Sequence, residues 1–490
     1  MGSALSCQRR LDGMEEWGMM AATTVKRENN MVATRDIGSR LELFVDDWLI
    51  ENMDCVSLQM HRPVPQEVTL QLDRPWESST SALLTTEKDG DRYRMWYRAG
   101  ADGEQRAAYL ESADGKVWER PNLGLVEFEG SSANNIMKKG TVASELSAFR
   151  DENPAATAGQ QYKAISRVRH HTDDRDAMRG HASPDGIHWT VLYPDPLLVA
   201  PNDGTRPIFD SQNTVFWDGL RGHYTAYLRS WLPDDGSGNT DRGRGFRSIR
   251  RSKSEDFLHW TDPKQIDLGD STPEHLYTNA ATPYFRAPHI YLMFPRRFVP
   301  ERQFHADLDV TGASEGVFMT SRDGISWDRR FMAPFIPPGP DPDNWTDRNM
   351  TVGRGVVPTG PAEISLYYKE HNRVPSGRFR RGSLRTDGFV SAYATFSGGE
   401  MLTRPLTFAG SELVLNYGTS AAGALRVEIQ DAEGQPIQGY TLDDSEEIWG
   451  DEIERVARWR GGSELGQLAG QAIRLRFAMT EADIYSLRFR

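Results

Sequence analysis

The sequence of 490 residues predicts an all-β protein in which a five-bladed β-propeller is followed by a small C-terminal β-sandwich. Three observations lead to this prediction: a turn phrase that recurs along the chain, an aromatic strand upstream of each copy, and a change of pattern near residue 399. Equivalent modules at a regular spacing indicate a repeat architecture. Four short strands per module are typical of propeller blades.

The recurring phrase is Ser-x-Asp-Gly-x-x-Trp. Its copies end at Trp118, Trp189, Trp260 and Trp327, and a weaker copy lies at 385–391. The Asp side chain can hydrogen-bond to the backbone ahead of it, and the Gly accepts the positive φ of a tight turn. The Trp begins the next strand and supplies a large apolar anchor. We therefore expect each phrase to be a hairpin that packs a blade, not a part of an active site.

A short aromatic strand precedes each hairpin. In chain order these strands are RYRMWYRA (92–99), QYKAISRV (161–168), HYTAYLRS (223–230), HIYLMF (289–294) and EISLYY (363–368). A third strand runs into the turn, and the stretches before and after complete the module. Helix signals are scarce between residues 78 and 398, because strand-sized segments alternate there with Gly, Pro, Asp and Asn.

The pattern divides the chain into three predicted parts. Residues 1–38 are expected to be a flexible N-terminal lead-in. Residues 39–398 would form the propeller, and LELFVDDWLIE at 41–51 is the candidate for the strand that closes its ring. From residue 399 to residue 490 the repeat is replaced by alternating apolar and polar side chains, which predicts the β-sandwich.

Composition excludes several classes of function. The formal net charge of -13 is opposite to the basic footprint of a nucleic-acid-binding protein. No stretch approaches the roughly 20 apolar residues of a membrane span, and the N-terminus lacks the apolar core of a secretory signal. The two cysteines form no metal-binding pattern with histidines. We expect a cytoplasmic protein, or a secreted one if the start site is misassigned, with no nucleic-acid or membrane partner and no cofactor.

An acidic residue lies near the start of each module. In chain order these residues are Glu77, Asp151, Asp210, Glu274 and Asp347. Because the innermost strand of each blade lines the axial channel of a propeller, we expect these carboxylates to converge there. Several carboxylates around one axis repel one another unless they bind cations, share protons or take part in chemistry. A structural cation such as calcium could lie among them, but no ligand spacing specifies a metal.

Asp210 and Glu274 are the preferred catalytic pair. Asp210 follows an apolar approach and precedes a polar run, which indicates a carboxylate in an enclosed, polar-lined position. Glu274 is followed by His275, Tyr277 and Asn279, whose side chains would suit sugar hydroxyls. An acidic residue at a strand end is also a common capping residue, so this alternative stays open for each carboxylate.

Basic and aromatic residues near the same positions complete the candidate site. The further residues expected to contact the substrate are Trp76, Asp347, Arg348, Glu370 and His371. The rings of Trp76 and Tyr277 offer flat faces on which a sugar could stack. Arg348 and His371 could reach the same end of the channel as the carboxylates.

The hairpin phrase resembles that of the five-bladed β-propeller glycosidases of glycoside hydrolase families 32 and 43. The phrases LFVDDWLI, DRPWE, FDSQN, PEHLYTN and NWTDRN also resemble a glycosidase-like group. The resemblance implies three acidic residues at the starts of the first three blades, which are Glu77, Asp151 and Asp210 here. The families have Asp first and Glu third, and the family 32 phrases W-M-N-D-P-N-G, R-D-P and E-C are missing. An alternative assignment uses Asp47, Asp210 and Glu274.

We therefore expect a glycoside hydrolase that acts on a terminal sugar. Glu274 would be the acid and Asp210 the base or nucleophile, with Glu77 and Asp151 beside them. One alternative is a glycoside phosphorylase, in which basic residues hold phosphate. The residues that suggest it are Arg296, Arg297, Arg348 and His371. The other alternative is a non-catalytic carbohydrate-binding propeller, because a fold does not fix a function.

Overall fold

The computed structural model describes residues 33–101, 103–140, 143, 145–201, 209–232 and 245–490. Within these ranges the protein is all-β, and its helical turns are the short 3-10 segments η3 (Pro342–Asn344) and η4 (Gly466–Leu468). No helix in these ranges is long and apolar enough to cross a membrane. The chain divides into two compact units, Met60–Phe389 and Met1–Gln59 with Val390–Arg490. We call them the propeller unit and the terminal unit.

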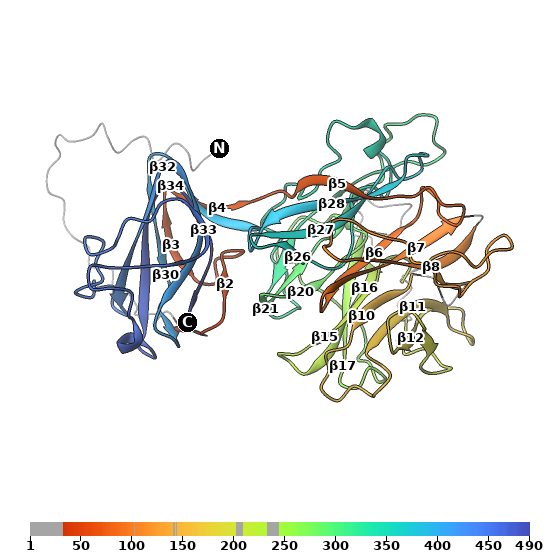
Figure 1. The fold of residues 1–490 in the computed structure, drawn as a ribbon, viewed down its shortest axis with the longest axis horizontal. Coiled ribbons are helices and arrows are strands. Elements are labelled where there is room, and N and C mark those ends of the chain that lie inside the picture. Colours follow the sequence, from red (N-terminus) through yellow and green to blue (C-terminus); the bar gives the residue numbers. More distant parts are fainter. Residues whose placement is uncertain (1–32, 102, 141–142, 144, 202–208, 233–244) are drawn as a thin grey trace. The chain divides into compact units, whose positions relative to one another are not determined.

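The propeller unit is a series of small antiparallel sheets (Figure 1). In chain order its strands are β5 (Val64–Gln71), β6 (Ala82–Asp89), β7 (Arg92–Ala101), β8 (Glu104–Ser112), β9 (Ile136–Lys139), β10 (Ser147–Arg150), β11 (Tyr162–Arg169), β12 (Asp176–Ser183), β13 (Thr190–Val191), β14 (Leu198–Val199), β15 (Thr214–Asp218), β16 (His223–Trp231), β17 (Arg247–Ser254), β18 (Lys264–Gln265), β19 (His275–Leu276), β20 (Thr282–Tyr284), β21 (Ala287–Met293), β22 (Arg296–Val299), β23 (Ala313–Gly316), β24 (Met319–Ser321), β25 (Thr351–Val352), β26 (Val357–Gly360), β27 (Glu363–Glu370) and β28 (Arg378–Arg385).

The sheets follow the predicted modules. Strands β6 to β9 form the first sheet, β10 to β14 the second and β15 to β18 the third. The fourth module is split between the sheets β19-β22-β23 and β20-β21-β24, and the last sheet joins β25 to β28 with β5. The first strands contact one another in turn, β6 with β10, β10 with β15 and β15 with β20, and β25 lies against β6. The all-β propeller is thus confirmed, whereas five blades remains the predicted number because the fourth module is split.

The recurring phrase forms hairpin turns that join neighbouring modules. The Oδ1 atom of Asp185 accepts hydrogen bonds from the N–H groups two and three residues ahead, at 2.9 and 2.8 Å. The turn carbonyls accept bonds from the aromatic strand of the preceding module. Trp96 Nε1 donates to Gly186 at 2.7 Å, and the Tyr227 hydroxyl donates to Gly324 at 2.7 Å. The phrase therefore packs modules together, as the sequence predicts.

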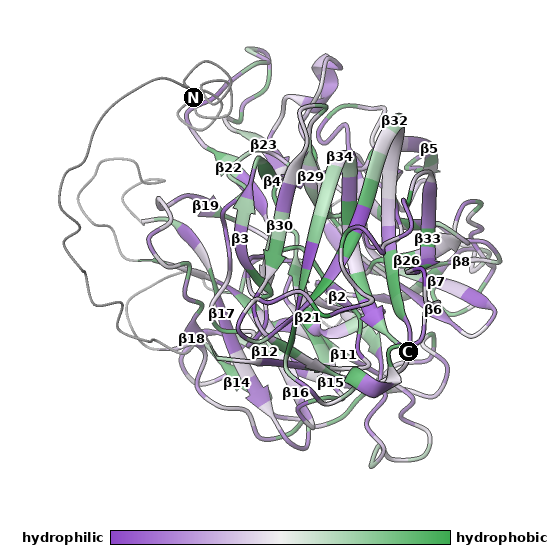
Figure 2. Ribbon diagram, turned by 90° about the vertical axis from the view of Figure 1, so that its left-hand side faces the viewer, coloured by the Kyte–Doolittle hydropathy of each residue, from purple (hydrophilic) through white to green (hydrophobic). Residues whose placement is uncertain are grey.

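The terminal unit is an all-β unit whose strands enclose one apolar core. In chain order the strands are β1 (Arg35–Gly38), β2 (Glu42–Leu43), β3 (Ile50–Asp54), β4 (Val56–Met60), β29 (Val390–Ala394), β30 (Gly399–Thr403), β31 (Leu406–Phe408), β32 (Leu413–Asp431), β33 (Asp451–Val456) and β34 (Ile473–Phe489). Buried and partly exposed residues alternate along β34. The hydropathy colours alternate along β32 and β34 in the same manner (Figure 2).

The segment at 41–51 does not close the propeller ring. It contributes β2, which pairs with β34, and the start of β3, which pairs with β30. Its apolar residues Phe44 and Leu49 lie in the core of the terminal unit. The closing strand is instead β5, which comes before the first module in sequence but pairs with β28 of the last.

The domain boundaries also differ from the predicted ones. Strand β1 lies within the predicted lead-in of 1–38 and pairs with β31, while residues 1–32 lie outside the described ranges. Strand β29 lies before residue 399 but pairs with β34. The terminal unit is therefore built from both ends of the chain.

Candidate active site

Two carboxylates come together where the second and third modules begin. Glu145 lies shortly before β10, and Asp210 lies shortly before β15. The backbone N–H of Ser211 donates to Oε2 of Glu145 at 3.2 Å. The charge of Asp210 is also close enough to raise the pKa of Glu145. Because β10 and β15 are neighbours in the ring, these two carboxylates share one end of the innermost strands.

Glu145 is the buried acid of the pair, with only 5% of its surface exposed. Burial is the main cause that raises its pKa to about 8, and Asp210 raises it further. The cations Arg167 and Arg98 act in the opposite direction. Glu145 also has a φ of 57°, in the left-handed region that side chains other than Gly rarely adopt. At neutral pH this carboxylic acid keeps its proton and could donate it.

Asp210 is the more exposed carboxylate, with a side chain that is 40% exposed. Its Oδ1 atom accepts a hydrogen bond from Nη1 of Arg167 at 3.2 Å. Arg167 is held in turn by Asp176, whose Oδ1 atom lies 2.8 Å from Nη2. A carboxylate that faces both solvent and a fixed guanidinium group is suited to act as a base or nucleophile.

Each module also contributes a basic residue in the second half of its aromatic strand or just after it. These residues, which we call the basic ring, are Arg98, Arg167, Arg229, Arg296 and Lys369. The charges that act on Arg98 include those of Glu145 and Asp210, and the same two carboxylates act on Arg229. The carboxylate pair therefore lies in a strongly cationic environment.

Tyr277 lies among three guanidinium groups. Its ring centroid is 5.3 Å from Cζ of Arg229, 4.6 Å from that of Arg247 and 4.3 Å from that of Arg296. Its backbone N–H donates to the carbonyl of Arg296 at 2.8 Å. The structure thus brings this predicted contact residue to the basic ring.

Asp347 and Arg348 reach the same region in different ways. Asp347 is bound by Arg373, with Nε–Oδ1 at 2.5 Å and Nη2–Oδ2 at 3.0 Å. Arg348 lies 3.4 Å from Asp347, and its charge acts on both Arg98 and Arg296. Asp347 is therefore neutralised, whereas the Arg348 side chain, which is 39% exposed, adds positive charge to the site.

Asp151 lies at the other end of its innermost strand, because it follows β10 whereas Glu145 precedes it. Its Oδ2 atom lies 2.6 Å from Nζ of Lys163 and accepts a bond from the Tyr224 hydroxyl at 2.8 Å. The same contact recurs in two other modules, between Tyr162 and Asp89 and between Tyr291 and Asp218. Asp151 thus links two modules. Glu145, and not Asp151, lies near the start of β10, where the sequence predicts an acidic residue.

Glu77 has a fully buried side chain with its own partners. It accepts hydrogen bonds from the Tyr97 hydroxyl at 2.6 Å and from Nη2 of Arg120 at 2.8 Å. A buried carboxylate that is fixed by an arginine and a tyrosine holds the first module together. These contacts do not connect it to Asp210.

Glu274 is bound by two arginines, Arg329 at 2.7 Å and Arg297 at 3.2 Å. Among the described residues, no hydrogen bond or ion pair joins Glu274 to Asp210. The contacts of Glu274 are therefore with arginines, and its pairing with Asp210 stays a prediction.

Four predicted contact residues have structural partners inside the fold. The Trp76 indole donates to Asn135 at 2.9 Å, and His275 accepts a hydrogen bond from the backbone N–H of Arg247 at 3.0 Å. Asn279 donates to the carbonyls of Gln212 and Tyr227, both at 3.1 Å. Glu370 is bound by Arg378 at 2.6 Å and by Arg380 at 2.9 Å. The side chains of His275, Asn279 and Glu370 are buried. These contacts position backbone segments and modules.

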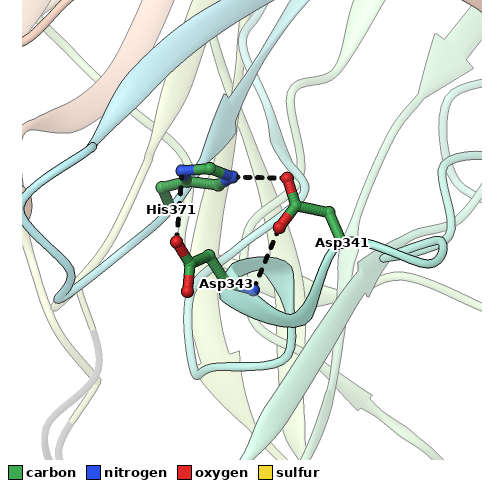
Figure 3. Close-up of side chains that lie close together, drawn as sticks. All are labelled: Asp341, Asp343 and His371. Carbon is green, nitrogen blue, oxygen red and sulfur yellow. Dashed lines mark hydrogen bonds and ion pairs between the residues drawn. The ribbon is translucent and has the colours of Figure 1, made fainter.

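His371 lies beside Asp341 and Asp343 (Figure 3). Its Nε2 atom is 2.8 Å from Oδ2 of Asp341, and its Nδ1 atom is 3.9 Å from Oδ2 of Asp343. Within the described ranges this is the one group of His and acidic side chains whose ligand atoms all lie within 4.8 Å. Nη2 of Arg378 lies 3.4 Å from the same Asp341 oxygen and supplies positive charge there. The arrangement is that of an ion-pair cluster that fixes the loop before Asp347.

No protein-family model matches the chain, and no curated protein does. Among solved structures, one described as a glycoside hydrolase has a TM-score of 0.46 at 12% identity, over 66% of this chain and 92% of its own. A family 32 β-fructofuranosidase from Bombyx mori has a TM-score of 0.39 at 10% identity, over 88% and 94%. A thermostable family 43 glycoside hydrolase has 0.42 at 15%, over 64% and 92%. The similar structures thus include both families that the hairpin phrase resembles, but likenesses this distant assign no activity to this chain.

Proposed function

We propose that the chain is a glycoside hydrolase that acts on a terminal sugar in the axial channel. The observation that supports this function best is the pair Glu145 and Asp210. The two carboxyl groups are close enough to interact, but one is buried and the other is exposed beside an arginine. Two carboxyl groups in such different surroundings, of which Glu145 has a raised pKa, are suited to divide the acid and base roles of glycoside hydrolysis.

In the proposed reaction Glu145 donates its proton to the glycosidic oxygen while the bond from the anomeric carbon to that oxygen breaks. Asp210 either takes a proton from the attacking water or attacks the anomeric carbon itself. In both cases the leaving alcohol carries the proton of Glu145, and water supplies the hydroxyl group of the released sugar. When Asp210 is the base, it releases the proton taken from water to the solvent, and Glu145 is reprotonated from the solvent. When Asp210 is the nucleophile, Glu145 takes its proton from the water that cleaves the covalent intermediate. Glu145 takes the acid role expected for Glu274, because Glu274 is bound by two arginines.

The test compares substrates that differ in their need for acid catalysis. A 4-nitrophenyl glycoside has a leaving group that departs without a proton, whereas an alkyl glycoside of the same sugar needs one. We expect Glu145→Gln to lower kcat/KM on the alkyl glycoside by about 100-fold or more but to have little effect on kcat/KM for the 4-nitrophenyl glycoside, because kcat/KM reports the step in which the leaving group departs. Asp210→Asn should lower kcat on both substrates. Glu274→Gln is the control and should retain activity.

An equal loss of kcat/KM on both substrates in Glu145→Gln would contradict the acid role, and full activity of Asp210→Asn would contradict the pair. If no glycoside in a panel of neutral and acidic sugars is cleaved by the unmodified protein, the proposed function itself is wrong.

A glycoside phosphorylase is the second candidate, and the basic ring is the observation that favours it. In such an enzyme inorganic phosphate replaces water, so that a sugar phosphate is released. Arg98 and Arg348 would hold the phosphate by charge-assisted hydrogen bonds, and Arg296 would add buried positive charge. Release of a sugar phosphate only when phosphate is present would decide for this candidate.

A further inference from the structure

The basic ring contains cations whose contacts within the described ranges are to neutral groups. Arg98 donates from Nη2 to the carbonyl of Thr80 at 2.9 Å. Arg296 donates from Nη1 to the hydroxyl of Thr351 at 2.6 Å. The Nζ atom of Lys369 is buried and has no hydrogen-bond partner among the described residues. Three modules therefore each contribute to the basic ring a cation that has no hydrogen bond or ion pair with a carboxylate among the described residues.

These charges are also withdrawn from water. Arg296 is 3% exposed and Lys369 is 0% exposed. Burying a cation without an anionic partner is unfavourable, because the lost hydration is not replaced. Burial accordingly lowers the pKa of Lys369 to about 7, and the neighbouring charge of Arg98 lowers it further, while the carboxylate of Glu77 acts in the opposite direction. An anion in the channel would offset this unfavourable burial.

The carboxylates near the ring do not balance its charge. Glu145 is protonated at neutral pH because its pKa is raised to about 8. Asp210 faces Arg167, and Asp347 is bound by Arg373. Glu77, which acts on Lys369, is bound by Arg120. The whole chain has a net charge of -13, so this positive site is a local feature and not a property of the surface as a whole.

We propose that the basic ring is an anion-binding site and that the substrate taken there includes a negatively charged oxygen group. The proposal extends the function given above by naming the class of substrate. The anion is either a carboxylate or sulfate on the sugar, or the free phosphate of a phosphorylase. Arg98 is half-buried and would contact the anion directly, while Arg296 and Lys369 would supply buried positive charge.

The test measures binding without turnover, by isothermal titration of the full chain with D-glucuronate, D-glucose, inorganic sulfate and inorganic phosphate in separate experiments. We expect at least one anion to bind more tightly than glucose, with an affinity that falls as salt is added. Binding of glucuronate or sulfate indicates a charged sugar, and binding of phosphate alone indicates the phosphorylase reaction.

The variants locate the site. Removing one charge-assisted bond in Arg98→Gln should weaken anion binding about 10- to 100-fold. Lys369→Met should also weaken it, and because this variant replaces a buried charge with an apolar chain of similar length, the protein should still fold. Lys253→Gln is the matched control, since Lys253 is an exposed cation on β17.

Glucose binding as tight as that of every anion would overturn the proposal, and so would anion binding that neither Arg98→Gln nor Lys369→Met reduces. Because no turnover is needed, anion binding can fail while glycosides are still cleaved, and glycoside cleavage can fail while anions still bind.

Discussion

The buried carboxyl group of Glu145 should make the stability of the propeller unit fall as the pH rises. Its pKa is about 8 in the folded protein against 4.5 in a model carboxyl group. The folded state therefore holds this proton more tightly than the unfolded state, and the resulting stability is complete below about pH 4.5. It is lost as the pH rises through 8. At about 1.4 kcal/mol for each pH unit, the upper limit of the loss is about 5 kcal/mol.

The variant Glu145→Gln isolates this effect, because an amide of the same shape does not ionise. The assay is thermal unfolding of both proteins from pH 5 to pH 9. For a unit of roughly 330 residues, about 5 kcal/mol corresponds to a difference of about 7 °C in Tm. We expect the unmodified protein to lose up to this much Tm relative to the variant between pH 5 and pH 9. Other titrating groups are common to both proteins, so curves that stay parallel would refute the reasoning.

Three further predictions concern neighbouring groups. Asp210→Asn should lower the pKa of Glu145, because the Asp210 charge raises it. The pH above which the remaining kcat falls should therefore be lower than in the unmodified protein; an unchanged or higher value would mean that the charge of Asp210 does not act on Glu145. Lys369→Met should be more stable than the unmodified protein below pH 7, because the pKa of Lys369 is lowered to about 7, and the difference in unfolding free energy should shrink as the pH rises toward 10.5. A difference independent of pH would mean that burial does not disfavour the charged form of Lys369. Asp151→Asn should destabilise the propeller unit by about 3–5 kcal/mol in urea unfolding, because it leaves the Lys163 ammonium without its partner. The kcat per folded molecule should stay unchanged. A loss of kcat with normal stability would instead mean that Asp151 takes part in catalysis.

The sequence was sufficient to predict the all-β propeller, because the hairpin phrase determines its own local structure. Asp185 accepts the bonds of its own turn, and such local contacts are visible as a pattern of neighbouring residues. The role of the segment at 41–51 could not be predicted in this way. Its apolar residues could pack in the core of either unit. Only the pairing of β2 and β3 with distant strands decides that they belong to the terminal unit.

The candidate site was predicted less well, because a shift of a few residues moves a side chain to the other end of a strand. Asp151 and Glu145 flank the four residues of β10, and no motif indicates which of them shares an end with Asp210. The basic ring, by contrast, could have been predicted from the sequence. Each aromatic strand carries or is followed by an Arg or Lys at a similar place, but these residues stand out only when the strands are aligned with one another.

The pairing of β5 with β28 has a consequence for synthesis on the ribosome. Gln66 and Ser383 are hydrogen-bonded across 317 positions of the chain, so the ring cannot close until its last module has emerged. The terminal unit must wait still longer, because β1 and β2 pair with β31 and β34. Until then both edges of the nascent sheet array are exposed to pairing with other chains. Chaperone binding to nascent chains is therefore expected to persist until β34 has emerged from the ribosome.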